Sequence, residues 1–327
     1  MRVAQRYGEG HRVLVTGGAG FVGSHLVDAL LARGCTVVAV DNFLTGTKDN
    51  IAHLGSQPRF ALVEADVTEP FPADAGPLAE RFDAIMHLAS PASPTDFSHL
   101  PIEILRVGSI ATLRLLDRAL ADRARFIMAS TSEAYGDPLV HPQPESYWGN
   151  VNPVGIRSVY DEAKRFAEAA TMAYRRFHGL DTGIVRIFNT FGERMRPDDG
   201  RAIPTFIAQA LRGEPITVHG TGAQTRSICH VDDLVRGIVA LLDSTEPGPI
   251  NCGTEHEISM RELAELIVRL TGSRSPITFV GRTADDPEKR RPDLTLAREK
   301  LGYEPVVAPE DGLRRTIEHF ASRLATS

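Results

Sequence analysis

Short apolar segments alternate with longer stretches of helical apolar spacing through the first half of the chain. The short segments are almost continuously apolar, which is typical of strands covered by helices on both faces. Strand–helix alternation implies right-handed crossover connections between parallel strands. The sequence therefore predicts an α/β fold with a doubly wound parallel sheet. The expected strands are RVLVTG (12–17), TVVAVD (36–41), RFALVEAD (59–66), DAIMHLAS (83–90), RFIMAST (125–131) and TGIVRIFN (182–189).

The pattern changes after about Asn189. The stretch FGERMRPDDGRAIP is polar, rich in Arg and interrupted by Pro and Gly, so it is predicted to be a loop. Length suggests about two domains for 327 residues. Helices separated by short strands are expected at about 203–212, 231–242, 259–271 and 309–324. The expected division is a sheet domain over 1–189 plus roughly 226–252, and a smaller, interleaved substrate domain over roughly 190–225 and 253–327.

Composition limits the partners and the compartment. The formal net charge of −6 does not indicate nucleic-acid or membrane binding, so an anionic ligand would require a local group of arginines. The three cysteines, Cys35, Cys229 and Cys252, show neither a disulfide framework nor metal-ligand spacing. No apolar segment precedes the first strand, and none approaches the length of a membrane span. We expect a cytoplasmic protein without a metal ion, a nucleic-acid partner or a membrane anchor.

A glycine motif lies between the first strand and the first helix. The stretch VLVTGGAGFVGSHLV places Gly17, Gly20 and Gly23 at GxxGxxG spacing, where a tight turn lets the backbone and the helix N-terminus approach a pyrophosphate. Asp41 ends the next strand, and a carboxylate there accepts ribose hydroxyls and repels a 2′-phosphate. No Arg stands beside Asp41, so NAD is favoured over NADP. The expected fold is a doubly wound parallel Rossmann sheet with a smaller, interleaved C-terminal substrate domain.

Tyr160 and Lys164, in YDEAK, are four residues apart and thus on one face of a helix. An isolated pair of this kind is usually solvated, but here it follows the stretch STS by about thirty residues in a Rossmann chain. A phenol acts as a base near neutral pH only if its anion is stabilised, and moving its pKa from about 10 to about 7 requires roughly 4 kcal/mol. A neighbouring ammonium and a positive nicotinamide can supply this. Thr131 is expected to orient the same substrate hydroxyl.

The sequence resembles the extended short-chain dehydrogenase/reductases through TGGAGFVG, STSEAYG and YDEAK, and more closely the UDP-glucuronate decarboxylase (UDP-xylose synthase) family. That resemblance covers nearly the whole chain and implies a homodimeric NAD enzyme whose smaller domain holds the nucleotide-sugar. The dimer is expected to form through two helices of the Rossmann domain. The matching stretches are HLASPASP, ASTSEAYGDPLVHPQPESYWGNVNP, YDEAKR, RIFNTFGERM, DGRAIPTFIAQAL, GEPITVHGTGAQTR and DDPEKRRPD.

The resemblance also implies a reaction, in which UDP-glucuronate is oxidised at C4, loses CO2 from C5, is protonated at C5 and is reduced again at C4 to give UDP-xylose. In this reaction Tyr160 takes the C4 hydroxyl proton, and Glu133 lies beside C4 and C5 and handles protons or a water there. Ser132 stands where related 4,6-dehydratases carry an Asp, which favours decarboxylation. Arg290 matches the arginine that the family places near the substrate carboxylate, for recognition or proton delivery.

The resemblance assigns a set of site residues. The predicted catalytic residues are Thr131, Glu133, Tyr160, Lys164 and Arg290. The predicted cofactor-binding residues are Gly17, Gly20, Phe21, Val22, Gly23, Asp41, Asn42, Phe43, Thr45, Gly46, Asp66, Val67, Leu88, Ala89, Ser90, Ala129, Tyr160, Lys164, Thr190 and Arg201. The predicted substrate-binding residues are Ser132, Arg106, Asn189, Arg196, Arg226 and Arg290.

Two departures from the family pattern lie in one predicted helix. Gly108 stands where relatives commonly have Asn, and the sequence offers no physical reason for it, since Gly also weakens a helix. Arg106 replaces a Lys and keeps the charge. His87 and His230 are expected to be core histidines or to support other site residues, and not to bind a metal, because no metal-ligand spacing surrounds them.

Other functions remain open on the sequence. The chain could be an NDP-sugar 4-epimerase, a 4,6-dehydratase, or a synthase that makes a branched pentose as well as xylose. From another class, it could be a non-catalytic NAD-binding regulator, although such proteins typically lose the Tyr or the Lys, and Tyr160 and Lys164 are both present. The mass of the product separates the decarboxylase, the epimerase and the dehydratase, because it reports loss of CO2, no change or loss of water.

Overall fold

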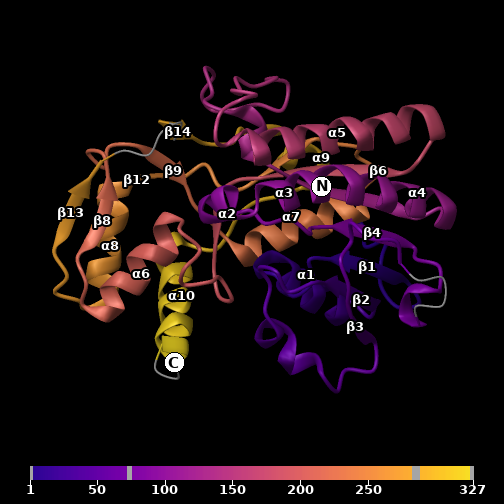
Figure 1. Ribbon diagram of the computed structural model, residues 1–327, viewed down its shortest axis with the longest axis horizontal. Helices are drawn as coiled ribbons and strands as arrows, with labels where there is room; N and C mark the ends of the chain where they lie inside the picture. The colour runs from indigo at the N-terminus through magenta and orange to yellow at the C-terminus, as the bar shows by residue number, and fades with distance from the viewer. Residues whose placement is uncertain (1–2, 72–75, 282–287, 325–327) are drawn as a thin grey trace.

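The computed structural model describes residues 3–71, 76–281 and 288–324. Asp285, Asp286 and Pro287, which begin the matched stretch DDPEKRRPD, lie outside the described residues. A larger unit holds the main sheet, and a smaller one lies beside it (Figure 1). The smaller unit is built around α6 (Ala202–Arg212), α8 (Met260–Thr271) and α10 (Pro309–Leu324). No helix among the described residues is long and apolar enough to cross a membrane.

A seven-stranded sheet forms the larger unit, in the order β11-β6-β5-β4-β1-β2-β3. Every neighbouring pair is parallel, which confirms the predicted doubly wound fold. The strand order reverses between β1 and β4, and ligands of such sheets bind outside the carboxyl ends of the strands at this switch point. The strands are β1 (Arg12–Thr16), β2 (Thr36–Asp41), β3 (Phe60–Glu64), β4 (Ala84–His87), β5 (Arg125–Thr131), β6 (Thr182–Ile187) and β11 (Ile250–Cys252).

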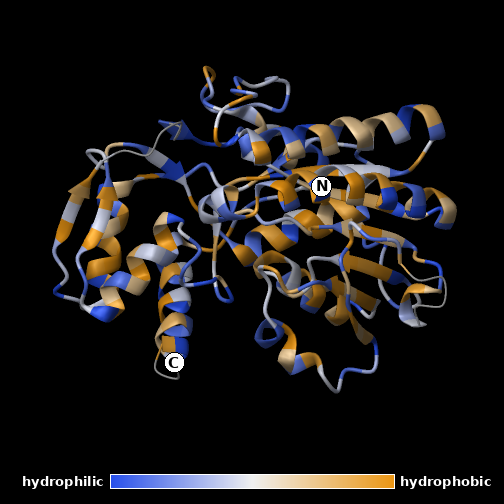
Figure 2. Cartoon of the chain, in the orientation of Figure 1, coloured by the Kyte–Doolittle hydropathy of each residue, from blue (hydrophilic) through white to orange (hydrophobic). Residues whose placement is uncertain are grey.

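Helices cover both faces of this sheet, which is why its central strands are apolar at successive positions. In β1, Val13 and Val15 join one hydrophobic core, whereas Leu14 between them joins the core on the opposite face. Figure 2 shows the hydrophobic colour concentrated along these strands and the helices that pack on them. One core takes residues from α1 (Phe21–Ala32) and α7 (Val231–Asp243), and the other from α4 (Thr112–Asp122) and α5 (Ser158–His178).

The short helix α9 (Thr295–Leu301) was not predicted, and its packing differs from the expected domain division. Leu294, Leu301 and Tyr303 belong to the same core as Val13, and α9 packs against β11 and α7. This part of 253–327 therefore packs with the Rossmann sheet and not with the smaller unit. The remainder of the expected division stays a prediction.

The smaller unit contains α6 (Ala202–Arg212), α8 (Met260–Thr271) and α10 (Pro309–Leu324), close to the predicted bounds. β8 (Ile216–His219) pairs in parallel with β13 (Ile277–Val280). A three-stranded sheet has β9 (Thr225–Ser227) between β12 (Glu257–Ser259) and β14 (Lys289–Arg290). Its register places Arg290 opposite Arg226, so two predicted substrate-binding arginines are neighbours although they are far apart in sequence.

Candidate active site

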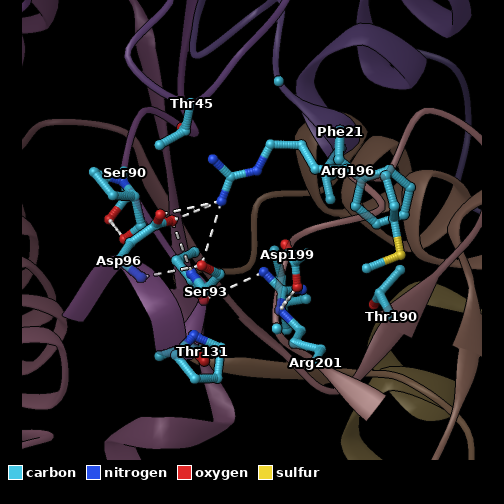
Figure 3. A pocket seen from close by; sticks show the side chains of 18 of the residues that line it. Phe21, Thr45, Ser90, Ser93, Asp96, Thr131, Thr190, Arg196, Asp199 and Arg201 are labelled. Atoms are coloured by element: carbon cyan, nitrogen blue, oxygen red, sulfur yellow. Dashed lines mark hydrogen bonds and ion pairs between the residues drawn. The ribbon is translucent and has the colours of Figure 1, made fainter. Parts of the chain in front are cut away.

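A cavity of about 460 Å³ lies at the carboxyl ends of the sheet strands, which is the expected size for a small-molecule site. Its walls come from both units of the chain. Nearly all the predicted site residues line it, including Gly17 and Asp41 from the first two βα turns and Arg226 and Arg290 from the smaller unit. Part of this lining is drawn in Figure 3.

The glycine turn between β1 and α1 leaves a backbone cradle. Gly17 has a φ of +71°, and a Cβ there would lie 2.8 Å from the amide nitrogen of Ala89. A Cβ on Gly23 would lie 1.9 Å from the carbonyl oxygen of Gly17, so only glycine fits. Gly20 caps α1 without a side-chain hydrogen bond, so the first amides of the helix are not satisfied by a capping side chain. These features fit a dinucleotide pyrophosphate.

Asp41 is fixed at the end of β2 by two backbone amides. Its Oδ2 accepts a hydrogen bond from Ala19 N at 2.9 Å, and its Oδ1 accepts one from Phe43 N at 2.8 Å. Burial raises the pKa of Asp41, and these backbone hydrogen bonds oppose the rise. A Cβ on Gly46 would lie 3.0 Å from the carboxylate oxygens, so the following loop passes close to them. The carboxylate is thus held at the cavity in the position expected for a ribose acceptor.

The pair on α5 lies against the end of β5. Lys164 Nζ donates to the carbonyl of Ala129 at 2.9 Å and lies 5.7 Å from the centroid of the Tyr160 ring. Burial raises the pKa of Tyr160 to about 12, Glu133 adds to the rise, and Arg201 and a hydrogen bond with Thr131 oppose it. Burial lowers the pKa of Lys164 to about 8. The chain's own groups therefore favour a protonated phenol, and lowering its pKa requires an added positive charge.

Glu133 lies on a 3₁₀ turn (Ser132–Tyr135) directly after β5. Thr131, and not Glu133, caps this turn, by accepting a hydrogen bond from Glu133 N at 3.2 Å. One carboxylate oxygen of Glu133 pairs with Arg157 at 2.5 Å, and the other pairs with Arg290. Burial favours the neutral acid, but the charges and hydrogen bonds of Arg290 and Arg157 prevail and lower the pKa of Glu133 to about 2. Glu133 is an ionised group here and not a proton donor.

Two residues that line the cavity near Tyr160 and Glu133 were missed by the sequence analysis. Phe97, from α2 (Pro94–His99), stacks on Tyr160 with ring centroids 4.9 Å apart and an angle of 20° between the planes. The second residue is Arg157, whose guanidinium lies over the Phe97 ring, 5.5 Å from its centroid. The capping pattern S-x-x-D at Ser93 and Asp96 does predict α2, but nothing in the sequence places α2 over Tyr160.

The two units are tied together across the cavity (Figure 3). Arg196 Nη2 binds Asp96 Oδ1 at 3.1 Å and Ser93 Oγ at 3.3 Å, so a loop of the smaller unit is anchored to α2. Arg201 pairs with Asp199 at 3.0 Å and donates to the carbonyl of Ala92 at 3.2 Å. Arg196, predicted to bind the substrate, and Arg201, predicted to bind the cofactor, are therefore both held by carboxylates at the cavity.

Three predicted residues do not line the cavity within the described part of the chain: Phe43, Asp66 and Arg106. Asp66 accepts a hydrogen bond from Asn42 Nδ2 at 3.1 Å, and Phe43 N donates to Asp41, so both support the loop that follows β2. Arg106 is exposed at the end of α3 (Pro101–Arg106), so its substrate contact stays a prediction. The predicted residues that do line the cavity are Gly17, Gly20, Phe21, Val22, Gly23, Asp41, Asn42, Thr45, Gly46, Val67, Leu88, Ala89, Ser90, Ala129, Thr131, Ser132, Glu133, Tyr160, Lys164, Asn189, Thr190, Arg196, Arg201, Arg226 and Arg290.

The structure supplies a reason for Gly108. It lies in a π-helical turn (Val107–Ala111), where a Cβ would come within 2.6 Å of the Cβ of Ala163 and 2.9 Å of its carbonyl oxygen. Ala163 lies on α5 between Tyr160 and Lys164. Glycine at 108 therefore allows this turn to pack directly on the helix that carries the pair, and a larger side chain would push the two apart.

His87 and His230 are both buried and held by hydrogen bonds. His87 is buried between Thr16, at 2.9 Å from Nδ1, and Thr112, at 3.2 Å from Nε2, and burial lowers its pKa to about 3. His230 Nε2 lies 3.1 Å from Glu193 Oε2. Within the described residues no group of three or more His, Cys, Asp or Glu side chains is arranged to hold a metal ion.

Comparison with known proteins shows the family to which the chain belongs. Residues 13–253 match the model of the NAD dependent epimerase/dehydratase family. The chain is 49% identical to UDP-glucuronic acid decarboxylase 1 of Arabidopsis thaliana over 96% of its length and 70% of that protein. It is also 49% identical to UDP-glucuronic acid decarboxylase 1 of Danio rerio over 96% of its length and 73% of that protein.

A solved structure shares the whole fold. UDP-glucuronic acid 4-epimerase from Bacillus cereus, in complex with UDP-glucuronic acid and NAD, is 29% identical, with a TM-score of 0.86 over 96% of this chain and 99% of that one. The decarboxylases are the more similar in sequence, and the match to them runs through both units of the fold. This chain belongs to the UDP-glucuronic acid decarboxylases of the NAD dependent epimerase/dehydratase family.

Proposed function

We propose that this chain is a carboxy-lyase that converts UDP-glucuronate to UDP-xylose with NAD, through a 4-keto sugar. The observation that carries the proposal is Arg290, which is 2% exposed and reaches from the smaller unit to Glu133, in the cavity that also contains Tyr160 and Lys164. A neutral sugar brings no carboxylate for a buried guanidinium at this position, whereas a uronate does. The 49% identity to UDP-glucuronic acid decarboxylases favours loss of that carboxylate over epimerisation at C4.

The cofactor is NAD, and the residues present fit it. The glycine cradle and the N-terminus of α1 would take the pyrophosphate, and Asp41 would take the adenosine ribose. Bound NAD supplies hydride acceptance from C4 of the sugar and return of the same hydride at the end of the cycle. The absence of a Cβ at Gly23 lets α1 pack directly on the glycine turn, which places the N-terminus of the helix at the cavity.

Tyr160 moves the proton of the C4 hydroxyl. Its ring is fixed by the stack with Phe97 and its hydroxyl by Thr131, so its oxygen is held for a substrate hydroxyl to approach. Lys164 is anchored on the Ala129 carbonyl close to the ring, where its charge stabilises a phenolate when the proton has moved. When C4 is reduced again, Tyr160 gives the proton back to the C4 oxygen.

Glu133 and Arg290 act on the substrate carboxylate and on C5. Once C4 is a ketone, the C5 carboxylate is β to it, and the C5–C bond breaks with its electron pair entering an enolate as CO2 leaves. Arg290 recognises the substrate carboxylate, but a tight pair would stabilise the ground state and slow its loss, so the guanidinium must also remain attached to Glu133 and to the Gly136 carbonyl, at 2.8 Å. Glu133, ionised, orients the water that returns a proton to C5.

The nucleotide is held by the smaller unit. Arg226 and Asn189 line the cavity on this side and are suited to the UDP, while Arg196 and Arg201 lie where phosphate oxygens can exchange for Asp96 and Asp199. Arg106 does not line the cavity, and its contact with the substrate stays a prediction.

We further propose a cytoplasmic homodimer. Ile102, Leu105, Ile110 and Leu113, on α3, the π turn and α4, are exposed together with Phe166 on α5, and these helices lie on one side of the sheet. Apolar side chains of this kind on adjacent helices suit a second copy packing as a four-helix bundle. Three buried free cysteines agree with a reducing compartment. Sedimentation at micromolar concentration tests the dimer, and a monomer there would contradict it.

The reaction is tested by incubating the protein with UDP-glucuronate and a catalytic amount of NAD, followed by a mass spectrum of the nucleotide-sugar. A product lighter by one CO2, without accumulation of NADH, is expected. Unchanged mass with inverted C4 would identify a UDP-glucuronate 4-epimerase, the second candidate, which the fold of the Bacillus cereus enzyme favours. Loss of water would identify a dehydratase, and binding of NAD without any turnover would identify a regulator.

A further inference from the structure

The carboxylate of Glu133 is shared by two arginines that come from different parts of the chain. Arg290, on β14, takes one oxygen, and Arg157, immediately before α5, takes the other at 2.5 Å. The side chains of Glu133 and Arg157 are only 14% and 17% exposed, so this pair is largely removed from solvent. Whatever happens to Arg290 when a substrate carboxylate arrives, Arg157 remains as the second contact of Glu133.

Arg157 is firmly placed. Its backbone carbonyl accepts the amides of Tyr160 at 3.0 Å and Asp161 at 3.2 Å, so it is built into the first turn of α5. Its guanidinium lies 5.5 Å from the ring centroid of Phe97, which stacks on Tyr160. Arg157 therefore contacts both the Phe97 ring that stacks on Tyr160 and the carboxylate of Glu133.

The balance of charge makes a second cation necessary. Asp161 is 5% exposed, and its Oδ1 is buried without a hydrogen-bond partner among the described residues. Burial and the nearby Glu133 raise the pKa of Asp161 to about 7, while Arg157 and Arg290 oppose the rise. Near neutral pH, Glu133, a partly ionised Asp161 and the substrate carboxylate would share Arg157 and Arg290, with Tyr160 alongside. Without Arg157, a single guanidinium would have to serve all of them.

We propose that Arg157 is a positioning residue that keeps the Glu133 carboxylate ionised and in place when Arg290 also takes the carboxylate of the substrate. This rests on the proposed decarboxylation, because it assigns Arg157 to the protonation step at C5. Arg157 does not touch the reacting atoms in this account. It acts through Glu133, whose orientation toward the water depends on having a cation on its far oxygen.

The test compares Arg157→Gln and Arg157→Lys with a matched control, Arg165→Gln. Arg165 lies on the same helix and donates to the carbonyls of Ala134 and Trp148, at 3.1 and 2.8 Å, but does not touch Glu133. In Arg157→Gln, losing the opposite charge raises the pKa of Glu133 by about one to three units. The acidic limb of the kcat profile, measured with saturating UDP-glucuronate, should move up by that amount, with KM nearly unchanged. Arg157→Lys should restore most of the shift, and Arg165→Gln should leave the limb where it is.

A second readout needs no turnover. Carbon NMR of labelled glutamate side chains, with the Glu133 signal identified by its loss in Glu133→Gln, follows the titration of Glu133 directly. Arg157→Gln should raise this titration and Arg165→Gln should not. An unshifted titration together with an unshifted kcat limb would overturn the role of Arg157, even if the enzyme still released CO2. Failure of the wild-type protein to release CO2 would instead contradict the proposed function, and the titration would still report on the Glu133–Arg157 pair.

Discussion

The two walls of the cavity are built by different means. The cofactor wall is fixed by backbone sterics: a Cβ on Gly23 would meet the Gly17 carbonyl at 1.9 Å, and Asp41 is held by main-chain amides. The substrate wall is held by charge pairs between side chains from distant segments, with Arg157 and Arg290 on Glu133 and Arg196 on Asp96. The cofactor wall has one shape. The arginines of the substrate wall can instead exchange the chain's own carboxylates for the carboxylate and phosphate groups of a ligand.

Tyr160 lies between the two walls, and its loss should have the largest effect. In Tyr160→Phe the ring stays stacked on Phe97, but the proton acceptor is gone, so turnover should fall by about 10²–10⁴-fold. NAD affinity and melting temperature should stay close to those of the wild type, because neither wall is altered. Single-turnover kinetics and NAD titration measure the two quantities. A large loss of NAD affinity in this variant would show that the walls are not separable.

Gly23→Ala should break the cofactor wall alone. The added methyl collides with backbone that cannot move aside, so the free energy of unfolding should fall by about 1–3 kcal/mol and NAD affinity by about tenfold or more. Gly281→Ala is the matched control, because nothing lies within 4 Å of a Cβ at that position. Isothermal titration with NAD and urea unfolding give both numbers. Equal NAD affinities and equal free energies of unfolding in the two variants would show that backbone sterics at Gly23 do not shape the cofactor wall.

Asp161→Asn should stabilise the folded protein in a pH-dependent way, because it removes a buried carboxylate charge from the substrate wall. Its folded pKa of about 7 lies above the unfolded value of 3.8, so ionising the carboxyl favours the unfolded state. The wild type therefore loses stability from this group as pH rises from about 4 to about 7, and the amide does not. The variant should gain stability over the wild type, on the order of 1–3 kcal/mol, at pH 8 but not at pH 4. Thermal unfolding at both pH values checks the sign, and a constant difference would contradict it.

The smallest effect is expected at the mouth of the cavity. Arg196→Gln removes a partly exposed pair with Asp96 and one cation suited to a diphosphate. KM for UDP-glucuronate should rise by about threefold to tenfold, while NAD affinity and kcat at saturation change little. Steady-state kinetics at low and high salt measure this, since the wild-type advantage should shrink as salt screens the charge. A change in kcat alone would move Arg196 out of substrate binding.

The same contrast explains what the sequence can and cannot predict. Six sheet strands, the helix after the glycine turn and the place of Asp41 follow from local pattern, because sterics and apolar periodicity act over neighbouring residues. The strand β11 is too short to stand out by pattern, and α9 is a short helix whose apolar side chains join the sheet core. Such elements gain their definition from tertiary packing.

The substrate wall could be predicted only through resemblance. Glu133 and Arg290 are 157 residues apart, and only the pairing of β14 with β9 brings Arg290 to the cavity. Arg157 and Phe97 carry no local signal, since an arginine before a helix and an aromatic residue in a short helix are common in any fold. Arg106 shows the reverse case, in which a family position is exposed and does not line the cavity. The tight packing of Gly108 on Ala163 likewise depends on how two helices meet.

We propose that one site oxidises C4, releases the C5 carboxylate and returns a proton from water to C5. The most direct measurement is the mass and the NMR spectrum of the nucleotide-sugar formed from UDP-glucuronate with catalytic NAD in D2O. We predict a UDP-pentose that has lost CO2 and carries a single solvent deuterium, at C5, with the hydrogen at C4 retained from the substrate. A UDP-uronate of unchanged carbon content, epimerised at C4, would contradict the account.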